Sequence, residues 1–196
     1  MDRFGYMKLI DKNAYERNKE AVHNENKYVF NCMNTDKICI FTDTGKMHTI
    51  KAVDIPLGRF RDKGTPVDNL SNYDSSQERM LYVAPVGQLR SDRLLFVTKT
   101  SMCKLVEGAE FDVAKRTIAS TKLADEDELI FIGSASEMEQ IVLQSHGGCF
   151  LRFLTQEVST MKKTALGVRG MKLADDDYLE HAYLLAGHQE YTISYH

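Results

Sequence analysis

The chain has 196 residues, of which 43% are hydrophobic and 27% charged, and its formal net charge is −3 at pH 7. This length and composition suit one globular domain or a short repeat array, and the slight negative charge excludes a uniformly basic nucleic-acid binder. No apolar run approaches the roughly 20 residues of a membrane span, and the first residues lack the apolar core of a signal peptide. We therefore expect a cytoplasmic protein without a membrane partner.

The amino-terminal third predicts short strands separated by one polar helical stretch. Residues 2–11, DRFGYMKLID, are typical of a turn and a following strand. Residues 13–24 favour a helix, but they are too polar to be a core element. Residues 37–55, KICIFTDTGKMHTIKAVDI, predict an apolar strand, a polar turn and a second strand.

The strand-turn-strand pattern returns at residues 93–111, RLLFVTKTSMCKLVEGAEF, and at residues 140–158, QIVLQSHGGCFLRFLTQEV. Four turn residues mark these units at irregular spacing: Gly5, Gly45, Ser101 and Gly148. A recurring period of this size indicates a repeat architecture. We expect one domain, 1–196, built from units of roughly 1–34, 35–90, 91–138 and 139–196.

Short apolar runs in these units predict buried strands. They occupy residues 38–41, 94–97, 117–123, 129–132 and 141–143. A run without polar alternation indicates a strand that is covered on both faces, as in small sheets stacked around an axis. The pattern predicts an all-β, propeller-like array of about four blades, with a two-sheet sandwich as the alternative. The alternating residues 191–195 are expected to form a strand that pairs with a neighbouring unit.

One phrase occurs twice, as KLADEDELI at residues 122–130 and as KLADDDYLE at residues 172–180. We interpret Lys-Leu-Ala-Asp as the closing strand of a blade and the acidic cluster as a turn. The alternative is a Mg²⁺ or Ca²⁺ site, with the candidate ligands Asp125, Asp127, Asp175 and Asp177. Neither copy has the Gly and the bidentate Glu of a calcium loop, so we expect no metal and no cofactor.

Other residue types give no pattern for catalysis. Cysteines at 32, 39, 103 and 149 form no C-x-x-C pair and lie in strand-like stretches, which predicts buried, reduced thiols. Neither the nine tyrosines nor the six histidines show the spacing of a nucleophile or of metal ligands. Gly147 and Gly148 lack the further glycines and the helix of a phosphate loop. We expect no catalytic residue.

The later units resemble the repeats of the C-terminal domain of the A subunit of bacterial type IIA topoisomerases, the DNA gyrase and topoisomerase IV family. The family motif is a strand, a Thr-Lys-x-Gly turn, a strand ending in a basic residue, and a basic loop before Gly-Val-x-Gly-x-Lys-Leu. Thr98, Lys99 and Lys104 match one copy. A second copy is matched by Gly148, Arg152, Gly167, Val168, Arg169, Gly170, Lys172 and Leu173.

The resemblance implies a β-pinwheel, a propeller variant whose basic outer rim binds and bends double-stranded DNA. It implies a non-catalytic fragment of a bacterial, nucleoid-associated topoisomerase. Its partners there would be the catalytic core of the A subunit, together with the ATPase-bearing B subunit. The gyrase signature box, Gln-Arg-Arg-Gly-Gly-Lys-Gly, has no counterpart; the nearest stretch is RFRDKGTP at residues 59–66. The chain opens within a repeat, so we expect an excised fragment.

Basic residues precede the expected closing strands, and acidic residues follow them. A strand of about seven residues at roughly 3.3 Å each would separate the two clusters by about 23 Å. The recurrence favours a basic rim that contacts phosphates over scattered surface charges. The expected DNA-binding residues are Lys46, Arg59, Arg61, Lys63, Lys99, Lys104, Lys115, Arg116, Lys122, Arg152, Lys162, Lys163, Arg169 and Lys172. The alternative is a protein-interaction module without a nucleic-acid role, which an apolar patch on the ring face would favour.

Overall fold

The computed structural model describes residues 1–187 and 190–193, and its regular structure is mostly β. The first strands are β1 (Tyr6–Met7), β2 (Lys37–Thr42), β3 (Lys46–Lys51), β4 (Thr65–Pro66), β5 (Met80–Pro85), β6 (Arg93–Thr98) and β7 (Met102–Glu107). The later strands are β8 (Thr117–Ala119), β9 (Leu129–Ser134), β10 (Gln140–Ser145), β11 (Phe150–Leu154), β12 (Val168–Arg169) and β13 (Leu179–Leu185). Short helices are α1 (Lys12–Arg17), α2 (Lys19–Glu25), α3 (Val67–Leu70), α4 (Val86–Leu89), η1 (Ala52–Asp54), η2 (Gly108–Phe111) and η3 (Thr155–Glu157).

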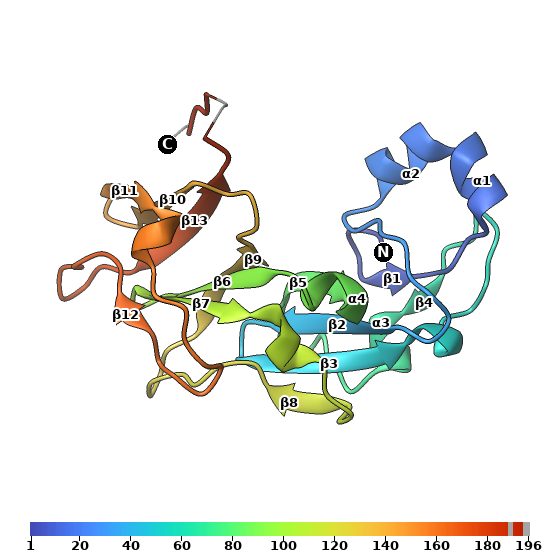
Figure 1. Ribbon diagram of the computed structural model, residues 1–196, viewed down its shortest axis with the longest axis horizontal. Coiled ribbons are helices and arrows are strands. Elements are labelled where there is room, and N and C mark those ends of the chain that lie inside the picture. Colours follow the sequence, from blue (N-terminus) through green and yellow to red (C-terminus); the bar gives the residue numbers. More distant parts are fainter. Residues whose placement is uncertain (188–189, 194–196) are drawn as a thin grey trace.

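The described strands form four sheets. Their strand orders are β1-β4, β5-β2-β3-β8, β12-β7-β6-β9 and β11-β10-β13. These sheets follow one another along an arc, with the amino-terminal and carboxyl-terminal units at its opposite ends (Figure 1). The expected all-β, propeller-like array of about four units is confirmed, and the two-sheet sandwich is wrong.

The central strands β2, β6 and β10 are buried on both faces, as their apolar runs predict. In β6, Leu94 and Phe96 contribute to the core on one side of the sheet, whereas Leu95 and Val97 contribute to the core on the other side. Successive side chains of a strand point to opposite faces, so a strand between two cores must be apolar throughout. Three apolar clusters therefore separate the four units, and each lies between consecutive sheets.

In the first three sheets, one edge strand comes from the following unit, and we call it the exchanged strand. β4 pairs with β1, β8 with β3, and β12 with β7, all antiparallel. The matching residue pairs are Met7 with Thr65, Met47 with Ile118 and Cys103 with Val168. Each exchanged strand has only two or three residues, and the loop before it carries basic residues. This exchange places the loop of one unit against the sheet of the unit before it.

The doubled phrase does not form a closing strand. β8 ends at Ala119 and β12 at Arg169, and residues 122–124 and 172–174 lie outside strands. Leu123 and Leu173 instead turn toward the cores, and Leu123 approaches the hairpin turn at Gly45. Apolar packing thus replaces ladder pairing in this segment. The acidic turns are confirmed at residues 125–126 and 175–176.

Three smaller expectations have mixed outcomes. The helical stretch is confirmed as α1 and α2, in which Val22 is the buried residue. All four cysteines are free, but Cys149 is exposed in the β10–β11 turn, which contradicts the expectation that every thiol is buried. Residues 191–193 form no strand, and Ser194 and Tyr195, the rest of the expected terminal strand, lie outside the described residues.

Candidate nucleic-acid interface

Three basic loops lie at equivalent places along the outer edge of the array. Each loop is fastened by its backbone to the second strand of the preceding unit. The amide of Leu9 donates to Pro56 O at 3.1 Å, that of Leu105 to Ser159 O at 3.1 Å, and that of Thr49 to Arg116 O at 2.8 Å. The strand exchange therefore places a basic loop at the same position in three successive units, along the outer edge that we call the rim.

Seven of the fourteen expected DNA-binding residues lie in or directly beside these loops. They are Arg59, Arg61 and Lys63 before β4, Lys115 and Arg116 before β8, and Lys162 and Lys163 before β12. All of them are exposed except Lys163, which is half-buried. The amide of Lys122 donates to Lys163 O at 3.1 Å, so the segment after β8 adjoins the loop of the next unit.

The other expected residues are less concentrated. Arg169 is exposed on β12, Arg152 is exposed on β11, and Lys46 and Lys172 are exposed elsewhere. Lys99 lies in the β6–β7 turn, where its ammonium is 3.5 Å from a carboxylate oxygen of Glu128 and 4.9 Å from the centre of the Tyr178 ring. These residues extend the basic surface beyond the three loops.

Lys104 does not belong to the surface set. Its side chain is 1% exposed, and its ammonium donates to the carbonyl oxygens of Lys162, Lys163 and Ala165 at 3.3, 3.0 and 2.6 Å. Burial lowers the pKa of this ammonium to about 8, against the opposing effect of Glu110. The expectation of a direct phosphate contact is wrong for Lys104, because the hairpin pairing of β6 and β7 points this side chain inward.

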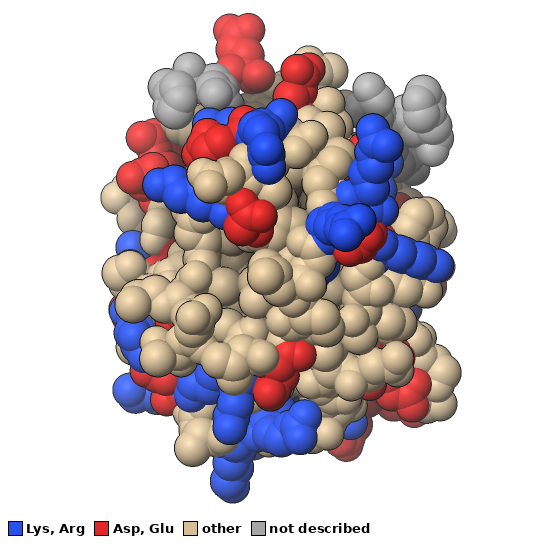
Figure 2. Space-filling view, turned by 90° about the vertical axis from the view of Figure 1, so that its right-hand side faces the viewer, with Lys and Arg blue, Asp and Glu red and all other residues tan. Residues whose placement is uncertain are grey.

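Acidic groups compensate part of the loop charge. The Glu110 carboxylate lies 3.5 Å from the Lys162 ammonium and 3.9 Å from that of Lys163. The strand of about seven residues expected between the basic and acidic clusters is also wrong, since β8 has three residues and β12 two. At the amino-terminal end of the array, Lys and Arg gather at the margins of a broad uncharged surface, interspersed with Asp and Glu (Figure 2).

The acidic turns fasten neighbouring hairpins. Asp127 accepts hydrogen bonds from the amide and hydroxyl of Thr100, at 3.1 and 2.6 Å. Asp177 accepts one from the amide of Gly147 at 2.9 Å, and hydrogen bonds from Ser145 and Gly147 hold its pKa below the ordinary value. Among residues 1–187 and 190–193, no three His, Cys, Asp or Glu side chains cluster as metal ligands. The same residues contain no helix long and apolar enough to cross a membrane.

A buried polar cluster in the second unit has no counterpart in our sequence expectations. His48 Nε2 lies 2.5 Å from Glu78 Oε1, and His48 Nδ1 lies 2.9 Å from the Thr117 hydroxyl. Thr42 and Thr44 donate to the other Glu78 oxygen at 2.8 and 3.0 Å. Burial acts to raise the pKa of Glu78, but the hydrogen bonds and His48 outweigh it and hold that pKa below its ordinary value. No local pattern in the sequence indicates this cluster, because Glu78 lies 30 positions from His48.

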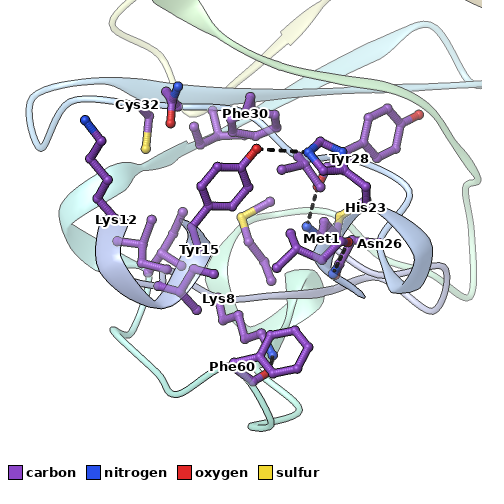
Figure 3. Close-up of a pocket in the computed structure, with 18 residues that line it drawn as sticks. Met1, Lys8, Lys12, Tyr15, His23, Asn26, Tyr28, Phe30, Cys32 and Phe60 are labelled. Carbon is purple, nitrogen blue, oxygen red and sulfur yellow. Dashed lines mark hydrogen bonds between the residues drawn. The ribbon is translucent and has the colours of Figure 1, made fainter. Parts of the chain in front are cut away.

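One cavity of about 380 Å³ lies between the strand of the first unit and the segment at residues 28–32 (Figure 3). Apolar side chains such as Met7, Val22 and Phe30 form much of its wall. Tyr15 and His23 meet across it, with the hydroxyl 3.0 Å from Nε2, and Lys8 lies beside Phe60. Lys8 donates to two backbone carbonyls, so the cavity offers apolar surface and no assembled catalytic group.

Comparison with known proteins decides the family. A model described as DNA gyrase C-terminal domain, beta-propeller, matches residues 36–75, 92–136 and 139–186, together more than half of the chain. The chain belongs to the DNA gyrase A C-terminal domain family. This domain is 25% identical to the DNA gyrase A subunit of Lawsonia intracellularis over 97% of the chain and 24% of that protein. It is 29% identical to the DNA topoisomerase 4 A subunit of Bacillus subtilis over 80% of the chain and 20% of that protein.

Solved structures share the fold of this member of the gyrase A C-terminal domain family. The C-terminal domain of DNA topoisomerase IV superposes with a TM-score of 0.78 and 23% identity, over 94% of this chain and 59% of that one. The E. coli ParC C-terminal domain superposes with a TM-score of 0.72 and 14% identity, over 95% and 78%. The chain spans a quarter or less of the length of the gyrase A and topoisomerase 4 relatives named above.

Proposed function

We propose that this domain binds and bends duplex DNA without sequence preference, through phosphate contacts along the rim of basic loops. The observation that carries the proposal is the threefold recurrence of an exposed basic loop at the same edge of successive sheets. Lys and Arg that neutralise phosphates position a duplex without reading its bases. An arc of such contacts favours DNA that curves with it, since a bent duplex meets more of the loops than a straight one.

This role also indicates how the domain would work within a larger enzyme. We infer that the domain presents DNA to the catalytic core of an A subunit, which works with an ATPase-bearing B subunit in a bacterial, nucleoid-associated topoisomerase. On its own the domain supplies binding and no strand cleavage. Relaxation of a supercoiled plasmid by the isolated chain would contradict this part of the proposal.

The direct test is the salt dependence of binding to a duplex of mixed sequence. We expect a dissociation constant of about 10⁻⁴–10⁻⁶ M at physiological salt, the range of non-specific binding. Replacing Lys162, Lys163 and Arg169 by Ala removes up to three phosphate contacts. The log–log salt slope should then fall by up to about 2.7, at roughly 0.9 per contact. Fluorescence anisotropy between about 50 and 200 mM salt measures this slope.

The matched control changes charge away from the proposed contacts. Asp175 and Asp176 are exposed in the second acidic turn, and replacing both by Asn should leave the slope almost unchanged. If the Ala and Asn variants shift binding in opposite directions, in proportion to the three positive and two negative charges that they remove, net charge and not the loops governs affinity. If the unmodified domain binds no duplex at about 50 mM salt, the proposal fails.

A second candidate function is a protein-interaction module. The observation that favours it is exposed apolar surface at the amino-terminal end of the array, where Phe4 of the first unit is 85% exposed and Leu57 of the second is 74% exposed. Large exposed apolar side chains often mark contact sites. Replacing both by Ser should abolish the association with a partner chain but leave duplex binding intact. Loss of duplex binding in that variant would contradict a rim formed by basic loops.

A further inference from the structure

The third residue after the hairpin turn is an inward-pointing basic side chain in three successive units. Lys8, His48 and Lys104 follow the turn residues Gly5, Gly45 and Ser101 by three positions. They occupy the same place in their sheets, because each follows a residue that pairs with the exchanged strand: Met7, Met47 and Cys103. Each side chain bonds the next unit: Lys8 and Lys104 bond the loop before its exchanged strand, and His48 bonds the first residue of that strand.

Two units use lysine and bond the loop backbone. Lys104 donates to three carbonyl oxygens of residues 162–165. Lys8 donates to the carbonyl oxygens of Phe60 and Asp62 in the basic loop of the next unit. An ammonium has three donors and no acceptor, so it can gather several carbonyls around one point. Such a bond from a charged group contributes more to stability than a neutral one.

The residue opposite each lysine is a glycine that no other residue can replace without strain. Gly64 has φ of +88°, and a Cβ there would lie 2.7 Å from Met7 O. Gly167 has φ of +102°, and its Cβ would lie 2.7 Å from Cys103 O. Both contacts are shorter than real Cβ atoms show. The loop backbone therefore approaches the preceding strand closely in both lysine units.

The second unit replaces both members of the pair. Its inward residue is His48, and the residue opposite is Thr117, which is not among the residues with positive φ. The two side chains bond directly, with His48 Nδ1 2.9 Å from the Thr117 hydroxyl. Glu78 takes the other ring nitrogen. Lysine with glycine and histidine with threonine are thus two solutions to the same attachment.

We propose that the inward residue three positions after each hairpin turn is a positioning residue for the basic loop of the next unit, and that it acts together with the residue opposite it. The pairs are Lys8 with Gly64, His48 with Thr117, and Lys104 with Gly167. None of these inward residues contacts DNA in this arrangement. An effect of these residues on DNA binding rests on the proposed function, whereas their effect on the position of the basic loop does not.

Hydrogen exchange of the free protein tests the loop directly. In Lys104→Met, the amides of Met161 and Ala165, which bond Leu105 O and Lys162 O, should exchange at least about tenfold faster, as expected for a loss of 1.4 kcal/mol or more. Amides of β2 in a different sheet should keep their rates. Lys19→Met, an exposed lysine of α2, is the charge-matched control and should change none of them. Unchanged protection at residues 161–165 in Lys104→Met would overturn the proposal.

The pair can also be tested by converting the second unit to the arrangement of the other two. The double variant His48→Lys, Thr117→Gly converts the second unit to the lysine solution, with Glu78 facing the new ammonium. Protection of the Thr49 amide, which bonds Arg116 O, should fall in each single variant and return in the double variant. A double variant that is no better than the worse single variant would contradict a paired function.

A double-mutant cycle then separates positioning from general destabilisation. Lys104→Met should weaken duplex binding in the unmodified domain, but it should have no further effect when Lys162 and Lys163 are already Ala. An equal loss in both backgrounds would show that Lys104 does not act through this loop. If the loop amides respond while no variant alters duplex binding, the proposed function fails and the positioning role stands.

Discussion

β7 and β11 occupy the same position in consecutive sheets, yet their surroundings differ. Residues 103–106 of β7 are all buried, whereas β11 alternates between exposed and half-buried side chains. Both strands form hairpins with a buried central strand. The difference is β12, which covers the outer edge of β7; within the described residues, no strand pairs with the outer edge of β11.

The sequence of β11 is not polar enough to explain its exposure. It reads FLRFL, and Phe150 and Leu154 are 45% and 43% exposed. The burial of a second strand thus depends on the strand and loop that the following unit contributes. The stability of such an array is the sum of the intrinsic stabilities of its units and the free energies of the contacts between neighbouring units. Here the contacts between neighbours contribute a large share.

The largest expected effect is a core truncation in β7 compared with the same position in β11. Leu105 is 1% exposed, so Leu105→Ala should lower the free energy of unfolding by about 2–5 kcal/mol. Arg152 matches it in register and is exposed, so Arg152→Ala should remain within about 0.5 kcal/mol. Urea denaturation measures both. Similar losses would show that β12 does not cause the difference.

The second largest expected effect is a pH dependence of the free energy of unfolding that arises from Lys104 in β7, since β11 has no buried lysine. The pKa of Lys104 falls from 10.5 to about 8 on folding because of burial. Between these values the unfolded chain binds more protons, so this contribution to stability rises with pH. From pH 8 to 10.5, the unmodified domain should gain up to about 3 kcal/mol over Lys104→Met, at roughly 1.4 kcal/mol per pKa unit.

This pH effect is measured as a difference between the two proteins, because buried tyrosines and cysteines titrate in the same range in the opposite sense. Burial raises the pKa of Tyr28, Tyr82 and Cys39 to about 12 in the folded protein. Ionisation of these groups in the unfolded chain lowers stability as pH rises, equally in both proteins. A constant difference between pH 8 and 10.5 would show that the Lys104 ammonium is not desolvated.

The smallest of the three effects detaches β12 from β7. Gly167→Ala should cost about 1–3 kcal/mol, because a side chain is strained at this φ and meets Cys103 O. The amides that β12 protects in β7 should then exchange nearly as fast as those of β11. Gly87→Ala is the control: the nearest atoms to its Cβ would be 3.6 Å away, and it lies in α4, where Ala is favourable. Retained protection at Cys103, which pairs with Val168 of β12, would contradict the dependence on β12.

The central strands could be predicted from sequence because burial on both faces leaves a local signature. The apolar runs at residues 38–41, 94–97 and 141–143 each coincide with a central strand. The exchanged strands have no such signature, since two or three residues show no periodicity and their partners lie far away in the chain. The strand predicted at Lys-Leu-Ala-Asp is wrong because its leucine packs against a core without belonging to a strand.

The candidate interface was predictable in outline only. Basic loops before β4, β8 and β12 are visible as clusters in the sequence, and exposure follows from their charge. The inward direction of Lys104 is not visible there, because it depends on hairpin register and on carbonyls that lie 58 to 61 positions away. The pairing of His48 with Glu78 is hidden in the same way, 30 positions apart.

The exchange of outer strands also sets a schedule for folding during synthesis. A second strand such as β7 leaves the ribosome about 65 residues before the strand that completes its sheet. At about 5–20 residues per second, the outer edge of each new sheet stays open for several seconds. During that interval its unpaired backbone can bind the wrong strand, including one from a neighbouring nascent chain. Gly167, directly before β12, lets this late-arriving strand approach Cys103 closely enough to close that edge.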